Sequence, residues 1–200
     1  MAQCSAFVTI RVLIQMQAAH SLKTFFSANQ KALRFLLLFG VIFGALYFLF
    51  GLAPGVRFGI IKPYTRFLAK GVVAIINLFG AGAWADGTVV TSDRFSINIA
   101  MGCDGVEASS LLAAGVLAFP TTWRAKAIGL GVGMPLIHVI NILRLVGLYY
   151  AGLFLPSVVE GIHVYVAQTI VILLSMAILV FWLERVATRR PHALNPSSSD

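Results

Sequence analysis

Long apolar runs separated by short polar segments make up most of this chain. Four of them predict transmembrane helices, because a spanning helix needs about 20 apolar residues. Proline ends the first two, at Pro54 and Pro120, as expected for a residue that cannot continue a helix. The four runs are residues 33–53, about 103–119, 127–155 and 162–183. We therefore expect an all-α polytopic membrane protein with about four transmembrane helices, connected late in the chain by loops at 121–126 and 156–161.

Residues 62–83 allow two interpretations. Lys62, Arg66 and Lys70 recur every four residues, and Asn77 lies near the same stripe among apolar residues. This pattern is typical of an amphipathic helix in the membrane interface. The alternative is a short span over about residues 68–85. We favour the interfacial helix, because a stripe of cations suits a membrane surface better than the bilayer interior.

Residues 86–100 have a different character from the helical segments. The stretch begins with an Asp-Gly turn signal at Asp86, is rich in β-branched residues, and alternates apolar residues at Phe95, Ile97 and Ile99. Alternation beside a turn signal predicts paired strands. We expect a small β-hairpin outside the bilayer.

Composition agrees with a membrane protein. Hydrophobic residues make up 59% of the 200 residues and charged residues only 11%, whereas a soluble domain has roughly 25% charged residues. This excludes a soluble globular domain and a disordered protein, and two cysteines, Cys4 and Cys103, are too few for a disulfide scaffold. The net charge of +8 is scattered in ones and twos between apolar runs. Anionic membrane lipid is therefore the expected partner, and nucleic acid is not.

The distribution of basic residues predicts the orientation. Arg185, Arg189 and Arg190 follow the last apolar run, which places the C-terminus in the cytoplasm by the positive-inside rule. Counting back through the spans, Arg124 and Lys126 lie inside. The expected hairpin and the residues that follow it then lie on the outer side of the membrane.

Three residues with reactive or charged side chains come to one depth in this topology. Cys103 lies at the outer end of its helix, and His163 begins the last span at the same face. Arg144 is 17 residues past the cytoplasmic end of its span at residue 127, or about 25 Å across the membrane. The topology used only flanking charges, so this convergence is an independent observation.

These residue types together can perform nucleophilic catalysis. Cys103 lies between Gly102 and Asp104 at a helix N-terminus, where backbone N–H groups and a nearby cation favour a thiolate. A histidine within reach can move the proton, and a fixed arginine can stabilise an oxyanion or position a substrate. The set of Cys103, Arg144 and His163 therefore indicates a cysteine transpeptidase or protease.

Each member of this set also has a purely structural interpretation. Cys103 would then be a small hydrophobic residue that fills space in the core. His163 would be an interfacial residue whose ring nitrogens reach the water at the membrane surface. An intramembrane arginine is costly and is a functional candidate by default, but Arg144 would also fit as an ion-pair partner of Glu107 or Glu160. Asn141 lies one helical turn from Arg144 on the same face and is placed to orient its guanidinium.

Other classes of function remain open from the residues alone. A small transporter or an anionic-lipid binder would use Arg144 without chemistry, and a scaffold for polysaccharide export would need no thiol. Both would tolerate Cys103→Ser. A transporter also predicts inverted repeats, which the sequence does not show. We expect no cofactor and no metal, because no H-E-x-x-H or paired acid motif accompanies His138,.

Three motifs resemble those of the exosortase/archaeosortase membrane transpeptidases, most closely the short exosortases of type H. They are G-C-D-G-V-E-A at 102–108, N-I-L-R at 141–144 and the histidine of G-I-H-V-Y at 161–165. The resemblance implies a site facing the periplasm of the bacterial inner membrane. Carried over by motif, Cys103 is the nucleophile, Arg144 the electrostatic element and His163 the acid/base. We expect Asn141, Asp104 and Glu107 to support them.

The resemblance also implies substrates and a domain organisation. Its substrates are exported proteins with a C-terminal sorting signal of the PEP-CTERM kind: a short motif, an apolar helix and a basic end. The signal is cut, and the new C-terminus is joined to a cell-surface acceptor. The exosortase-like membrane domain covers residues 33–185. Residues 1–32 are expected to be a dispensable or interfacial leader, and residues 186–200 a basic and then disordered cytoplasmic tail.

Overall fold

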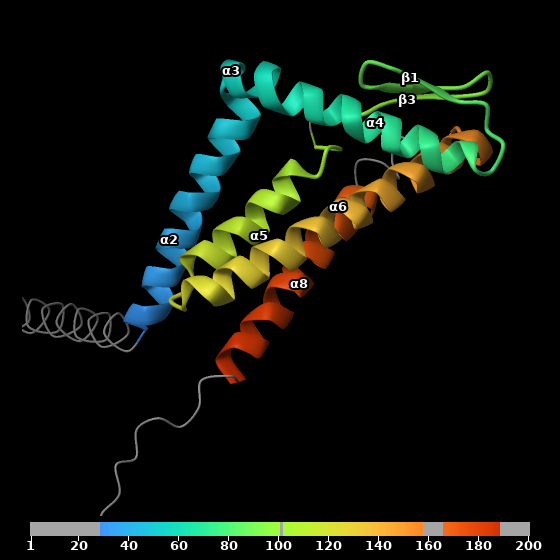
Figure 1. Ribbon diagram of the computed structural model, residues 1–200. Coiled ribbons are helices and arrows are strands. Elements are labelled where there is room, and N and C mark those ends of the chain that lie inside the picture. The colour runs from blue at the N-terminus through green and yellow to red at the C-terminus, as the bar shows by residue number, and fades with distance from the viewer. Residues whose placement is uncertain (1–28, 101, 158–165, 189–200) are drawn as a thin grey trace, which may run out of the picture. The chain divides into compact units, whose positions relative to one another are not determined.

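The computed structural model describes residues 29–100, 102–157 and 166–188. Met1–Leu38 form one compact unit and Phe39–Asp200 the other, and the candidate site lies within the second. The described elements, in chain order, are α2 (Gln30–Tyr47), η1 (Phe48–Leu52), α3 (Pro54–Val56), η2 (Arg57–Ile61), α4 (Lys62–Asn77), β1 (Trp84–Asp86), β2 (Val89–Thr91), β3 (Ser96–Asn98), α5 (Val106–Ala118), α6 (Trp123–Phe154) and α8 (Gln168–Thr188). The chain is thus mainly helical, with one small sheet (Figure 1).

Three helices of the described part are long and apolar enough to cross a bilayer. They are Gln30–Leu52, Trp123–Phe154 and Gln168–Val186. Helix α5 is apolar but has only 13 residues, a length of about 20 Å. A multi-pass membrane protein follows from these helices, and the expected total of about four spans stays a prediction.

Helices α5, α6 and α8 pack against one another, and glycines on α6 allow their close approach. A Cβ at Gly129 would lie 2.6 Å from Trp182 Nε1 of α8. A Cβ at Gly133 would lie 2.5 Å from Leu112 Cδ2 of α5. Small residues let helix backbones come together without voids. These contacts hold α6, which carries Asn141 and Arg144, against α8 and against α5, the helix that follows Cys103.

Helix α6 begins earlier than the sequence analysis predicted. Residues 121–126 were expected to form a loop, but the helix starts at Trp123. Thr122 has an extended backbone, and its hydroxyl accepts a hydrogen bond from the Ala125 N–H at 3.4 Å. A threonine in this position satisfies one of the unpaired N–H groups of a helix start. Arg124 and Lys126 therefore lie in the first turn of α6 and not in a loop.

Helix α4 is amphipathic, as predicted, and it is not among the helices that qualify as spans. Its buried face contributes Leu68, Ala69, Val72 and Ile76 to the core, while the basic stripe is exposed. In Figure 1 it crosses the ends of α5 and α6 beside the sheet. The alternative span over residues 68–85 is wrong, because the helix ends at Asn77 and a strand begins at Trp84.

Asn77 closes the connection between α4 and the sheet instead of belonging to a surface stripe. Its Nδ2 donates to the Ala83 carbonyl at 2.8 Å, and its Oδ1 accepts from the Ala83 N–H at 2.7 Å. The predicted hairpin is present and extended to three antiparallel strands in the order β1-β2-β3. Asp86 pairs with Val89 across the first turn, where Gly87 has φ +62°, the left-handed region that glycine adopts at no steric cost.

Candidate active site

Cys103 lies in a tight turn between the sheet and α5. Gly102 and Gly105 flank the turn with φ of +88° and +78°, a conformation that L side chains rarely adopt. The Cys103 N–H donates to the Ala100 carbonyl at 3.0 Å. At the other end, Asp104 Oδ1 accepts from the Val106 N–H at 3.0 Å and so satisfies one N–H at the start of α5. The sequence G-C-D-G thus builds a fixed turn that presents one cysteine.

Three consecutive backbone carbonyls of this turn each accept a side-chain hydrogen bond. Arg144 Nη1 donates to the Gly102 carbonyl at 3.4 Å. Asn141 Nδ2 donates to the Cys103 carbonyl at 2.9 Å. Tyr64 Oη donates to the Asp104 carbonyl at 3.0 Å. Two donors come from α6 and one from α4, so these two helices together hold the turn.

The Arg144 guanidinium is oriented toward the cysteine sulfur. Its Nη2 lies 3.8 Å from Cys103 Sγ, and its Nη1 also donates to Asn141 Oδ1 at 3.3 Å. Asn141 is fully buried. The Nε atom is buried and has no hydrogen-bond partner among the described residues. The structure therefore brings Cys103, Asn141 and Arg144 together, with one guanidinium donor uncommitted to any described group.

Burial sets the protonation of this site. Cys103 is only 3% exposed, and burial raises the pKa of its thiol, against which the Arg144 guanidinium acts in the lowering direction. Burial likewise raises the pKa of Asp104, opposed by the hydrogen bond from Val106. The sequence analysis expected the helix N-terminus and a cation to favour the thiolate. In the structure burial outweighs the Arg144 guanidinium, so the pKa of the Cys103 thiol lies above its ordinary value.

Glu107 and Glu160 were the two acids expected as possible ion-pair partners of Arg144. Glu107 Oε2 accepts a hydrogen bond from Gln168 Nε2 at 3.0 Å, which links the start of α5 to the start of α8, and its described partner is not Arg144. Glu160 and His163 lie outside the described residues. No contact is therefore described between His163 and Cys103.

Tyr64 and His138 are site residues that the sequence analysis missed. Tyr64 Oη lies 3.0 Å from His138 Nδ1, in addition to its bond to the turn. His138 could have been found from its spacing, because His138, Asn141 and Arg144 are three residues apart and residues with this spacing share a helix face. His138 was weighed only as a metal ligand. Among the described residues no group of three or more His, Cys, Asp or Glu could hold a metal ion.

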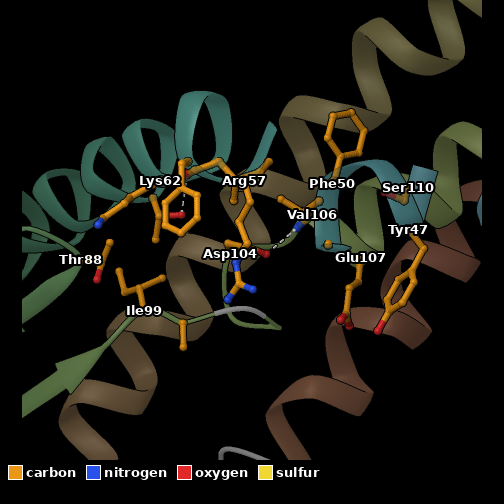
Figure 2. A pocket seen from close by; sticks show the side chains of 15 residues that line it. Tyr47, Phe50, Arg57, Lys62, Thr88, Ile99, Asp104, Val106, Glu107 and Ser110 are labelled. Atoms are coloured by element: carbon orange, nitrogen blue, oxygen red, sulfur yellow. Dashed lines mark hydrogen bonds between the residues drawn. The ribbon is translucent and has the colours of Figure 1, made fainter. Parts of the chain in front are cut away.

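Two cavities are bordered by residues of the site, one by Asp104 and the other by Arg144. The first, of about 260 Å³, is bordered by Asp104, Glu107 and Ile99 and by the basic residues Arg57 and Lys62. Figure 2 shows Arg57 reaching toward the turn that carries Asp104, whose carboxylate is bonded to Val106.

The second cavity, of about 280 Å³, lies between α6 and the beginning of α8. Arg144 is its polar member, and the other lining residues are small or apolar: Ile140, Gly147, Leu148, Ala151, Val166, Ala167, Ile170 and Val171. Arg144 therefore touches both the cysteine and an apolar groove.

The fold and the site define a multi-pass membrane protein that buries a cysteine against an arginine. A family model for transmembrane exosortases of the EpsH type matches residues 7–183. The chain belongs to the transmembrane exosortase family, whose members are associated with the processing of sorting signals. The match begins within the segment expected to be a leader, before residue 33. No curated protein and no solved structure matches the chain.

Proposed function

We propose that this exosortase is a membrane-embedded cysteine protease/transpeptidase of the bacterial inner membrane. It cleaves a PEP-CTERM-like C-terminal sorting signal from exported proteins and transfers the new C-terminus to a cell-surface acceptor. The observation that carries the proposal is the Arg144 guanidinium, 3.8 Å from Cys103 Sγ in a turn whose carbonyls are held by three side chains. A packing cysteine would not need such an arrangement.

The proposed reaction proceeds in two displacements. His163 takes the Cys103 proton, and the thiolate attacks the carbonyl carbon of the scissile peptide bond. Arg144 stabilises the oxyanion that forms, a role supported by its Nη2, which lies 3.8 Å from Cys103 Sγ. The carbon–nitrogen bond then breaks, the leaving amine takes the proton from His163, and a thioester to Cys103 remains. A nucleophilic O–H or N–H group of the acceptor then attacks the thioester carbonyl, and the carbon–sulfur bond breaks. His163 takes the proton of the acceptor and returns it to the Cys103 sulfur, which restores the enzyme.

Topology completes the proposal. We place the Cys103 turn at the periplasmic face and the C-terminus in the cytoplasm, with α5 as a fourth, short span and α4 in the interface. The Arg185 side chain in the last turn of α8 supports this orientation, because basic residues concentrate on the cytoplasmic side. The groove between α6 and α8 is apolar except for Arg144, which suits the apolar segment of a sorting signal arriving within the bilayer.

The test compares cleavage of an exported reporter ending in such a signal by wild-type protein and by Cys103→Ser and Cys103→Ala. Both variants should insert in normal amounts and cleave nothing, because an alkoxide forms far less readily than a thiolate at neutral pH. Tyr150→Phe is a matched control, since the Tyr150 hydroxyl is buried without a hydrogen-bond partner in the described structure. Substantial cleavage by Cys103→Ser would exclude a thiol mechanism and favour a non-enzymatic membrane role.

A further inference from the structure

The third hydrogen bond to the Cys103 turn comes from outside the three motifs. Arg144 and Asn141 belong to the N-I-L-R motif, but Tyr64 lies on α4, 40 residues before the Asp104 carbonyl that it holds. Tyr64 is in turn held by His138 of α6 at 3.0 Å, and the two rings are 5.6 Å apart between centroids. Helices α4 and α6 are therefore joined at the point where both reach the turn.

Hydrogen-bond chemistry fixes the direction of this chain of contacts. A backbone carbonyl can only accept, so Tyr64 must use its single hydroxyl proton on Asp104. The Tyr64 oxygen is then an acceptor toward His138, and Nδ1 of His138 must carry a proton. Burial, with the Asp104 charge as a second cause, raises the pKa of Tyr64 to about 12, so the phenol keeps its proton at neutral pH.

The geometry points to Tyr64 as a positioning residue for the nucleophile, with His138 as the group that orients the Tyr64 hydroxyl. Because a peptide unit is planar, fixing the Asp104 carbonyl also fixes the peptide that leads into Gly105, where the chain turns at φ +78°. The Cys103 side chain is thereby held against Arg144 from both ends of the turn. The catalytic meaning of this role rests on the proposed function, whereas the positioning itself does not.

The first experiment compares two Tyr→Phe variants that each remove a bonded hydroxyl. Tyr64→Phe removes the bond to the turn, and Tyr149→Phe removes a 2.8 Å bond to Ser92 beside the sheet. We expect Tyr64→Phe to lower kcat about 5- to 10-fold with KM unchanged, the factor for one buried hydrogen bond. Tyr149→Phe should lower the amount of folded protein and leave kcat per folded molecule unchanged. Equal kcat for the two variants would overturn the inference.

The His138 variants test the orienting role by rescue. His138→Asn keeps an N–H donor at the position of Nδ1, and His138→Leu does not. We expect His138→Leu to lower kcat as Tyr64→Phe does, and His138→Asn to restore most of it. The double variant Tyr64→Phe/His138→Leu should be no worse than Tyr64→Phe, because both act on one hydrogen bond. A His138→Asn variant as defective as His138→Leu would overturn the orienting role.

A reactivity measurement separates this inference from the proposed function. In a Cys4→Ser background Cys103 is the single thiol of the chain, and its alkylation by a small maleimide reports how firmly the turn is held. We expect alkylation to be several-fold faster in Tyr64→Phe and His138→Leu and unchanged in Tyr149→Phe. If no sorting signal is cleaved, the function fails while this result still supports the positioning. Unchanged alkylation in Tyr64→Phe overturns the positioning whatever the activity.

Discussion

Replacing Gly105 by alanine should damage the site through Asn141. An ideal Cβ at this position lies 3.1 Å from both Asn141 Cγ and Asn141 Nδ2, and Asn141 is fully buried, so it has little room to retreat. The atom it would move is the donor to the Cys103 carbonyl at 2.9 Å. The backbone adds a second penalty, because Gly105 has φ +78°.

The two penalties can be estimated separately. A non-glycine residue in the left-handed region costs about 1–2 kcal/mol. Leaving the buried Cys103 carbonyl without its donor costs about 1–3 kcal/mol more. Gly105→Ala should therefore lower the free energy of unfolding by about 2–5 kcal/mol. Gly87→Ala is the matched control, because Gly87 also has positive φ but its Cβ would meet nothing within 4 Å.

The assay is denaturant unfolding of both variants in detergent micelles, combined with reporter cleavage per folded molecule. Gly87→Ala should lose only the backbone contribution of about 1–2 kcal/mol and retain cleavage. Gly105→Ala should lose more stability and most of its cleavage. Equal losses of stability in the two variants, with cleavage retained in both, would refute the prediction that a Cβ at position 105 displaces Asn141.

Three further variants probe separate contacts of the site. Asn141→Leu should cost about 1–3 kcal/mol of unfolding free energy and reduce cleavage per folded molecule; an unchanged denaturation midpoint would contradict the bond to Cys103. Arg144→Leu should move the pH–rate profile of Cys103 alkylation to higher pH, because the guanidinium acts to lower the pKa of the thiol. A shift of the profile to lower pH would contradict this effect of Arg144 on the thiol. Glu107→Gln should keep reporter cleavage within about twofold, since an amide oxygen can still accept from Gln168; abolished cleavage would indicate that Glu107 acts on Arg144.

The sequence was sufficient for features that depend on local patterns. The helices at 33–53 and 127–155, the stop at Pro120 and the amphipathic helix from Lys62 follow from hydropathy and its period, and each appears in the structure. The Asp-Gly turn at Asp86 was equally readable, because its residues are specific to such hairpins. Motif resemblance placed Cys103, Asn141 and Arg144 in one site, and the contacts between them are present.

Features that depend on tertiary contact could not be predicted in this way. Tyr64 and His138 are 74 residues apart, so the sequence does not show that they meet, although His138 shares a helix face with Asn141 and Arg144. Asn77 looked like part of a polar stripe, but it bonds the backbone of Ala83. The rise in the pKa of Cys103 comes from its burial in the folded chain, whereas the sequence shows only the nearby cation, Arg144, which acts in the opposite direction.

The central claim is that Cys103 forms a thioester with its substrate, and mass spectrometry of trapped enzyme tests it most directly. Purified protein is mixed with a peptide that carries a sorting signal, quenched in acid and digested. We predict an adduct on Cys103 with the mass of the upstream fragment, released by hydroxylamine and missing from Cys103→Ala. Cleavage of the peptide by Cys103→Ala, or turnover by wild-type protein with no adduct on Cys103 at any quench time, would contradict the account.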